Sequence, residues 1–301
     1  MKKLFVITVL SFCALLLLSL ASISPNETYQ RVSQWGEGVL NRPMDIAWEG
    51  GLLYVADAEN QAITIFKDNG TLITRWRGFK RPISITVKGD NAYVVDFLAD
   101  EIVHLKNDGT EIRRWGRHGA GEGEFDGPSG IAVDSEGNVY VSDFYNHRIQ
   151  KFTREGRFLL QWGSDGRWGG RFHYPTDVAV ASHDQVYVAD AYNQRIQKFT
   201  SGGGYITKWG GIGFGIPGGW RGWFRLAKAI ALDRQGNVYV ADAFNRRIQK
   251  FTREGKFLTA WGQDQIRYAA GVAVGSGGQV YVSDFFNNRI LVFSVKSGTN
   301  P

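Results

Sequence analysis

Cysteine is almost absent from this 301-residue chain, since Cys13 is the only one. Because Cys13 lies inside an apolar N-terminal segment, the rest of the chain has no disulfide and no thiolate chemistry. Proline is also scarce, with seven residues against 38 glycines, which favours many tight turns over a Pro-rich linker. Helical periodicity of useful length is missing after residue 24. These absences exclude a disulfide scaffold, a cysteine-dependent enzyme and a helical bundle.

The first 24 residues differ in composition from the rest of the chain. Lys2 and Lys3 precede an apolar run at residues 4–23, and small residues such as Ala21 and Ser22 close the segment. This layout is typical of a cleaved signal peptide, and the run is also long enough to be an uncleaved membrane anchor. Both alternatives predict export, so we expect an extracellular, periplasmic or membrane-anchored protein whose body lies outside the cytoplasm.

The remainder of the chain repeats one unit. NVYVSDFYNHRIQKFTREGRFLLQWG (138–163) returns almost unchanged as NVYVADAFNRRIQKFTREGKFLTAWG (237–262). Each unit reads as four short strands, and the second strand is apolar at nearly every position, as in a sheet packed between neighbouring sheets. An aspartate ends this strand in each of six units, at Asp57, Asp96, Asp143, Asp190, Asp242 and Asp284. A tryptophan ends the fourth strand in five of them, at Trp76, Trp115, Trp162, Trp209 and Trp261.

The sixth unit lacks its fourth strand, and a matching strand stands at the other end of the chain. RVSQWG (31–36) precedes the first complete unit and resembles the closing strands FLLQWG and FLTAWG. A circular array needs such a shared strand to close its ring. We therefore predict an all-β fold, a monomeric six-bladed β-propeller of four-stranded antiparallel blades over residues 29–298, closed by the N-terminal strand.

The repeated unit also resembles a known family. GIAVDSEGNVYVSDFYNHRIQKFTREGRFLLQWG (130–163) is similar to the NHL repeat, and the resemblance covers the chain after residue 24, more strongly in units three to six. It implies the same six-bladed propeller. Secreted propeller lyases of similar fold, such as peptidylamidoglycolate lyases, hold a metal ion with histidines, so the resemblance also implies an enzyme alternative. Related propellers inside cells bind RNA, and the expected export argues against RNA here.

Residues present in every unit are expected to build the blades. In the third unit, Asp143 and Asn146 are predicted to satisfy the amides of a turn, and Arg148 to pair with a nearby aspartate. The repeated tryptophans are predicted to pack between blades. Candidates for function are therefore the departures from the repeat.

The longest departure, GGIGFGIPGGWRGWFRL (210–226), is expected to lie as an extended loop over the channel mouth. Tryptophan and arginine both stack and form hydrogen bonds, so loops that carry several of these residues are expected to form a recognition surface. The leading prediction is a non-enzymatic exported scaffold that binds a protein, peptide or cell-surface glycan on its loop face. The predicted ligand-binding residues are Trp168, Arg171, Trp220, Arg221, Trp223 and Arg225.

Two acidic residues fall at positions that should face the channel. Aligned across the six units, this position holds Asp45, Ser84, Gly130, Asp177, Ala229 and Gly271. Asp45 and Asp177 belong to opposite blades and are either two solvated acids or a pair that shares a divalent cation such as Ca²⁺.

Histidines define the enzyme alternative. His118, His147 and His173 fall in loops on the same predicted face. A metal-dependent lyase or hydrolase would use His118, His173 and the channel acids around Zn²⁺ or Ca²⁺. The predicted metal residues are therefore Asp45, Asp177 and His173, and no other cofactor is expected.

Overall fold

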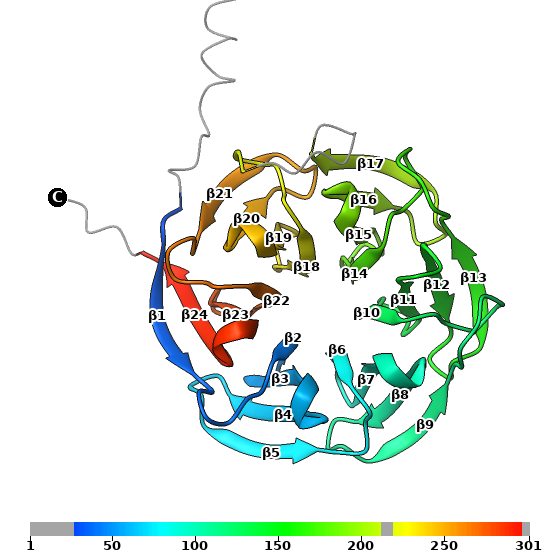
Figure 1. Cartoon of the computed structure of the whole chain (residues 1–301), viewed down its shortest axis with the longest axis horizontal. Coiled ribbons are helices and arrows are strands. Elements are labelled where there is room, and N and C mark those ends of the chain that lie inside the picture. Colours follow the sequence, from blue (N-terminus) through cyan, green and yellow to red (C-terminus); the bar gives the residue numbers. More distant parts are fainter. Residues whose placement is uncertain (1–26, 212–218, 297–301) are drawn as a thin grey trace, which may run out of the picture.

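The computed structural model describes residues 27–211 and 219–296. Within these ranges, 24 strands form six four-stranded antiparallel sheets around a central axis (Figure 1). The predicted six-bladed β-propeller is confirmed. The predicted leader lies outside the described residues. In the part of the chain that is described, no helix has the length and apolarity needed to cross a membrane.

Blades one to five each run in sequence order from an inner strand at the channel to an outer strand at the rim (Figure 1). Blade one contains β2 (Pro43–Glu49), β3 (Leu52–Asp57), β4 (Ala62–Lys67) and β5 (Leu72–Trp76), and blade two contains β6 (Pro82–Lys88), β7 (Asn91–Asp96), β8 (Glu101–Lys106) and β9 (Glu111–Trp115). Blade three contains β10 (Pro128–Val133), β11 (Val139–Asp143), β12 (Arg148–Phe152) and β13 (Phe158–Trp162), and blade four contains β14 (Pro175–Val180), β15 (Val186–Asp190), β16 (Arg195–Phe199) and β17 (Tyr205–Gly210). Blade five contains β18 (Ala227–Leu232), β19 (Val238–Asp242), β20 (Arg247–Phe251) and β21 (Phe257–Trp261).

Blade six is assembled from both ends of the propeller. Its inner strands are β22 (Ala269–Val274), β23 (Val280–Asp284) and β24 (Arg289–Val295), and its outer strand is β1 (Tyr29–Trp35). β1 pairs antiparallel with β24, with Tyr29 opposite Val295 and Trp35 opposite Ile290. The predicted closure by the N-terminal strand is confirmed. Tyr29 also stacks on Trp261 of blade five, with ring centroids 3.7 Å apart, so the closing strand is fixed to the next blade as well.

The repeated tryptophans pack between blades, as predicted. Trp115 of blade two lies against Phe152 of blade three, with ring centroids 6.0 Å apart. Trp162 contacts Phe199 in the next pair of blades in the same way, at 5.9 Å. Gly156 has a φ of +78° and faces the Trp115 ring so closely that a Cβ would lie 2.6 Å from it. A side chain at this turn would therefore force two blades apart.

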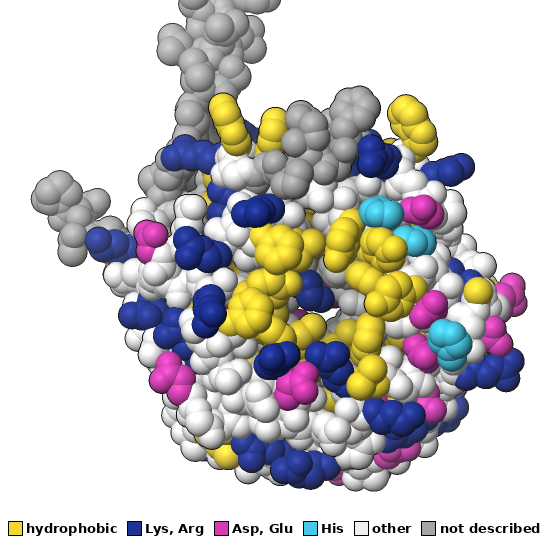
Figure 2. Space-filling model, viewed as in Figure 1, with side chains coloured by type: hydrophobic (Ala, Val, Ile, Leu, Met, Phe, Trp, Pro, Cys, Tyr) yellow, Lys and Arg dark blue, Asp and Glu magenta, His cyan; other side chains and the backbone are white. Residues whose placement is uncertain are grey.

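One face of the ring carries both the turns and the loops that differ among blades. Short 3-10 helices follow the second strand in five blades of the described chain: η1 (Ala58–Asn60), η2 (Phe97–Ala99), η3 (Ala191–Asn193), η4 (Ala243–Asn245) and η5 (Phe285–Asn287). The loops that enter the inner strands meet these turns, as where the His173 backbone N–H donates to Asp190 at 2.7 Å. We call this side the turn face, and Figure 2 shows it.

Candidate functional site

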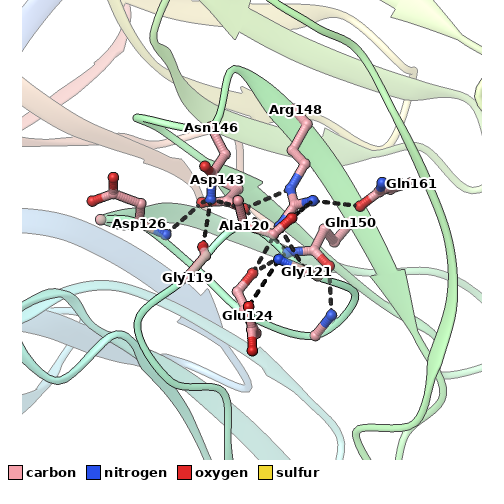
Figure 3. Close-up of polar contacts among 12 residues, drawn as sticks. Gly119, Ala120, Gly121, Glu124, Asp126, Asp143, Asn146, Arg148, Gln150 and Gln161 are labelled. Atoms are coloured by element: carbon pink, nitrogen blue, oxygen red, sulfur yellow. Dashed lines mark hydrogen bonds and ion pairs between the residues drawn. The ribbon is translucent and has the colours of Figure 1, made fainter.

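A buried network fastens each long loop of the turn face to its blade. In blade three, Asp143 accepts hydrogen bonds from the Asp126 backbone N–H (2.9 Å), from Asn146 and from Arg148 Nε (2.8 Å) (Figure 3). The Arg148 guanidinium then donates to the carbonyl oxygens of Ala120, Gly121 and Glu124. The predicted structural role of the repeated Asp, Asn and Arg is confirmed.

Sequence reasoning missed one member of this network. The Gln150 amide accepts from the Gly123 N–H (2.9 Å) and donates to the Glu124 carbonyl (2.7 Å) and to Asp143 (3.1 Å). Gln197 and Gln249 make the equivalent bonds in blades four and five. Burial raises the pKa of the network aspartates Asp143, Asp190 and Asp242. The neighbouring arginines and the hydrogen bonds partly offset this effect.

The turn after the second strand presents an apolar side chain in five blades of the described chain. This side chain stands two residues after the repeated aspartate and is about half exposed, between 49% and 57%. Figure 2 shows apolar side chains gathered around the central hollow of the turn face. We call the five residues the apolar collar: Leu98, Tyr145, Tyr192, Phe244 and Phe286.

Further rings join four of the five collar side chains into two pairs. Tyr174 lies 5.1 Å from Tyr192 and 6.1 Å from Tyr145, measured between ring centroids. Tyr268 lies 5.4 Å from Phe286 and 5.8 Å from Phe244. Because these rings support one another from neighbouring blades, the two pairs are preformed apolar patches rather than isolated side chains.

Arginines border the collar on one side. Arg225 lies over the Phe244 ring, Arg267 over Phe286 and Arg42 over Phe285, at 5.4 to 5.9 Å from the ring centroids. In blade one the collar position is Glu59, which pairs with Arg81 at 3.0 Å. Figure 2 shows Lys and Arg side chains mainly on the left of the collar, and Asp, Glu and His side chains on its right. The collar therefore has one cationic and one mixed acidic and histidine border.

The predicted ligand-binding residues fall into two groups. Arg225 lies at the collar. Trp168 and Trp220 are 79% and 77% exposed, and Arg195 and Arg247, at the start of the third strands, hold their backbone carbonyls. The glycines beside them face the outer strands, since a Cβ on Gly169 would meet Tyr205 and one on Gly222 would meet Phe257. Trp223 is half-buried at 6.3 Å from Trp220.

The remaining two arginines also lie at the rim. Arg171 is exposed beside Gly166, and Arg221 lines a cavity against the outer strand β21. The expected position over the channel mouth is therefore wrong for the part of the loop around Arg221, whereas Arg225, near the end of the same loop, lies at the collar. Residues 212–218 of this loop lie outside the described residues.

The channel acids lie at one level, as expected, but their oxygens tie blades together. Asp45 accepts from the backbone N–H groups of Ile46 (2.8 Å) and Ile85 (3.2 Å) and from Ser84 Oγ (2.7 Å). Asp177 accepts from Val178 (2.8 Å) and from Ile230 of the next blade (2.7 Å). Each carboxylate thus links its own inner strand to the following one. A shared cation stays a prediction.

A lysine that the sequence analysis did not single out accompanies the two acids. Lys228 lines a constriction of about 10 Å³ together with Asp45 and Asp177. Loss of hydration raises the pKa of both acids, and that of Asp177 further because Asp45 lies near it. Burial lowers the pKa of Lys228, and the two carboxylates oppose this effect. The sequence could have pointed to Lys228, because the residues at the same position of the other five units are uncharged: Met44, Ile83, Ser129, Thr176 and Ala270.

Two glycines make room for the channel acids. A Cβ on Gly130 would lie 2.5 Å from the Asp177 Cα, and one on Gly271 would lie 2.7 Å from the Asp45 Cα. The ring of six positions thus reads Asp, small residue, Gly twice over, a two-fold pattern within a six-bladed fold. On the side away from the collar, the channel widens into a cavity of about 240 Å³ lined by inner-strand residues such as Trp48 and Val180.

The histidines do not join the channel acids. His173 and His147 lie with Asp165 between blades three and four, and His118 lies with Asp100 and Asp126 one blade earlier. The residues proposed for one metal site, Asp45, Asp177 and His173, are therefore divided between the channel and the loops. The enzyme alternative, which drew on His118 and His173 together, is divided in the same way.

Comparison with known proteins supports the fold. The NHL repeat model matches residues 125–152, 172–199 and 267–293, in blades three, four and six. Comparison with curated protein sequences gives no significant match.

Several solved structures resemble the chain in fold. A streptogramin B lyase matches with a TM-score of 0.63 at 12% identity, over 89% of this chain and 98% of that chain. Virginiamycin B lyase from Staphylococcus aureus has a TM-score of 0.63 at 11% identity, over 89% and 100%. Hydrazine synthase from Kuenenia stuttgartiensis has a TM-score of 0.61 at 12% identity, over 86% and 96%. At these identities the likeness shows the fold alone.

Proposed function

Because the chain is a six-bladed β-propeller that contains NHL repeats, we propose that it is a non-enzymatic scaffold that binds a protein or peptide segment at the apolar collar. The observation that carries this proposal is the half-exposed apolar side chain at the same turn position of five blades. Contiguous exposed apolar surfaces on soluble proteins commonly mark binding sites. Aromatic residues at the centre of an interface supply most of its binding energy.

The chemistry of the collar favours a peptide over a glycan. Three of the five collar side chains, Leu98, Phe244 and Phe286, offer no hydrogen-bonding group to the hydroxyls of a sugar, whereas they match the apolar side chains of a peptide. The exposed Arg225 and Arg267 at the border favour carboxylates in the same ligand. The ligand class is therefore a segment with apolar anchors and acidic neighbours.

The two rim tryptophans extend the binding face. Trp168 and Trp220 occupy equivalent positions in the loops that enter blades four and five, and both are exposed by more than three quarters. They stand on loops fastened by the buried Arg network, so little ordering entropy would be lost on binding. A ligand anchored at the collar would reach them as secondary contacts.

The proposed location is outside the cytoplasm, with the partner at the cell surface. This part of the proposal rests on the apolar run at residues 4–23, which would be cleaved or would attach the protein to the membrane. Protease added to intact producing cells should digest the propeller. Protection of the chain until the cells are lysed would contradict export.

The separation of His118, His173 and the channel acids, described above, supports binding over the metal-dependent lyase alternative. That alternative needs these groups around one metal ion, close to a reacting bond.

A selection from a random peptide library displayed on phage tests the proposal. Peptides selected on the full-length chain should be rich in apolar and acidic residues. The double variant Phe244→Ser with Phe286→Ser should bind these peptides with an affinity at least about thirtyfold lower, which is the loss of roughly 2 kcal/mol expected for hot-spot residues. Trp168→Ser with Trp220→Ser should cause a smaller loss. Affinities are measured by isothermal titration calorimetry.

The matched control is Leu72→Ser with Ile73→Ser, since these β5 side chains are 42% and 47% exposed but lie on the outer strand. Their replacement should leave peptide affinity unchanged. Equal losses of affinity for the control and the collar variants would contradict the proposed site. So would a phage selection that yields no peptides while the chain binds sugars on a glycan array.

A further inference from the structure

Two histidines and an aspartate converge where the loop into blade four meets the turn of blade three. His173 Nδ1 lies 2.8 Å from Asp165 Oδ1, and His147 Nδ1 lies 3.9 Å from the same oxygen. One ligand atom from each of the three residues can be chosen so that all lie within 4.8 Å of one another. The two imidazole rings are parallel within 7°, with centroids 5.5 Å apart. Three donors of the kinds that zinc prefers therefore face a common point.

The local structure explains why these residues meet. His147 ends the turn of blade three in the left-handed region, with φ of 55°, and its Nδ1 accepts the Tyr174 N–H of the incoming loop. In that loop, Asp165 forms an isolated bridge with Phe172, and Phe172 is fully buried. The bridge sets the backbone of residue 173 beside that of residue 165. The site is thus built by two blades and does not depend on a flexible terminus.

The same three positions carry a second cluster one blade earlier. Asp100, His118 and Asp126 correspond to His147, Asp165 and His173, and the bridge between His118 and Phe125 repeats the one between Asp165 and Phe172. This second cluster has one imidazole and two carboxylates instead of two imidazoles and one carboxylate. Because imidazole suits zinc, copper and nickel, the two clusters should differ in affinity for such ions.

We propose that His147, Asp165 and His173 form a binding site for a divalent transition-metal ion such as Zn²⁺, which fastens the loop at 163–174 to the turn of blade three. Zinc is held by N and O ligands at about 2.0–2.2 Å, so small movements of the three side chains would close the coordination shell. The ion would replace the hydrogen bond between His173 and Asp165. It would also replace the bond that His147 Nδ1 accepts from the Tyr174 N–H (3.1 Å).

Hydrogen bonding supports the availability of one ligand. His147 Nδ1 accepts the Tyr174 N–H, so this nitrogen carries a lone pair in the folded protein. The site adjoins the collar, because the Tyr174 ring lies 4.5 Å from His147 and 4.6 Å from His173 between centroids. A bound ion would therefore stiffen one border of the collar.

Zinc titration of the full-length, tag-free chain by isothermal titration calorimetry tests the site. Two replacements copy residues at equivalent positions of other blades. His147→Gln copies Gln194, which has the same left-handed backbone (φ 50°). His173→Asn copies Asn41, which occupies the equivalent position in the loop into blade one. The wild type should bind one Zn²⁺ that each variant loses. Changes to groups behind the ligands alone cost about 10–100-fold in metal affinity, so loss of a direct ligand should exceed that range.

His118→Asn is the matched control, since it removes the histidine of the neighbouring cluster. It should keep the zinc affinity of the wild type within about twofold. Cobalt should give the visible absorption of a low-coordinate ion with the wild type and the control only. The proposal is overturned if the wild type binds no stoichiometric zinc, if His147→Gln or His173→Asn binds like the wild type, or if His118→Asn abolishes binding as well.

Discussion

Blades three to five hold their incoming loops differently from blades one, two and six. The loops into blades three to five are long, at 116–127, 163–174 and 211–226, and the others are short, at 36–42, 77–81 and 262–268. The long loops coincide with a buried glutamine on the third strand, whereas the short loops coincide with Thr64, Val103 and Leu291 at that position. The glutamine side chain therefore accompanies a long loop and is no general feature of the blade.

The position of the arginine also differs among blades, and in this respect blade six resembles blades three to five. Blades three to six place it at the start of the third strand, as Arg195 does. In blades one and two that position is Ala62 or Glu101, and an arginine of the outer strand reaches the loop instead: Arg75 donates to the Val39 carbonyl (2.9 Å), and Arg114 to the Gly78 carbonyl (2.8 Å). Loop carbonyls that would otherwise lack a partner must be satisfied, and either strand can supply the donor.

The largest effect should come from Arg195→Met in blade four. Its guanidinium pairs with the fully buried Asp190 at 2.6 Å, and removing one partner of a buried ion pair costs about 3–5 kcal/mol because the other charge remains. The free energy of unfolding, measured by urea denaturation, should fall by that amount. The control is Arg171→Met, on the exposed part of the loop that Arg195 holds. It should change the free energy of unfolding by less than about 0.5 kcal/mol.

A smaller loss is expected for Gln197→Leu in the same blade. Leucine resembles Leu291, which occupies the position in short-looped blade six, but here it would leave the Gly170 N–H without its acceptor (3.0 Å). An unsatisfied buried group costs about 1–3 kcal/mol. Urea denaturation measures the loss. If the substitution were neutral, the link between glutamine and loop length would have no energetic basis.

The smallest effect should come from Arg75→Met in blade one. This side chain is partly buried and its bonds to Thr64 (3.3 Å) and the Val39 carbonyl involve no charged partner, so a loss of about 1 kcal/mol in unfolding free energy is expected. A loss as large as that of Arg195→Met would show that the two arginines are equivalent. The comparison between blades would then fail on energetic grounds.

Much of the fold could be predicted because the repeat supplies its own alignment. Trp115 and Asp143 could be assigned to construction since each returns at the same place in other units, and RVSQWG could be recognised as the missing strand. Lys228 and Gln150 were overlooked although the same alignment contains them. Lys228 is the only charged residue at its position, and the glutamine is confined to three units.

The candidate sites were harder to predict because they depend on distances between blades. Tyr145 belongs to a repeated turn and was not singled out from the sequence, yet its exposure and its neighbours make it part of the collar. His147 and His173 are 26 residues apart, and they meet because the loop into blade four lies against the turn of blade three, where the Tyr174 N–H donates to His147. Trp220 was expected at the channel, but the length of a loop does not show whether the loop extends toward the channel or toward the rim. Arg247 instead holds the Trp220 carbonyl, and the next residue, Arg221, lies against the outer strand β21.

The closing strand also sets how the ring responds to force. Tyr29 and Val295 are direct partners at one end of the β1–β24 pair, so the chain enters and leaves the propeller side by side. A pull that separates the two ends would load the hydrogen bonds of this pair one after another, as in opening a zipper, instead of all at once. The seam would therefore yield at a lower force than the same strands pulled in shear, and blade six would open first while the other five kept their sheets.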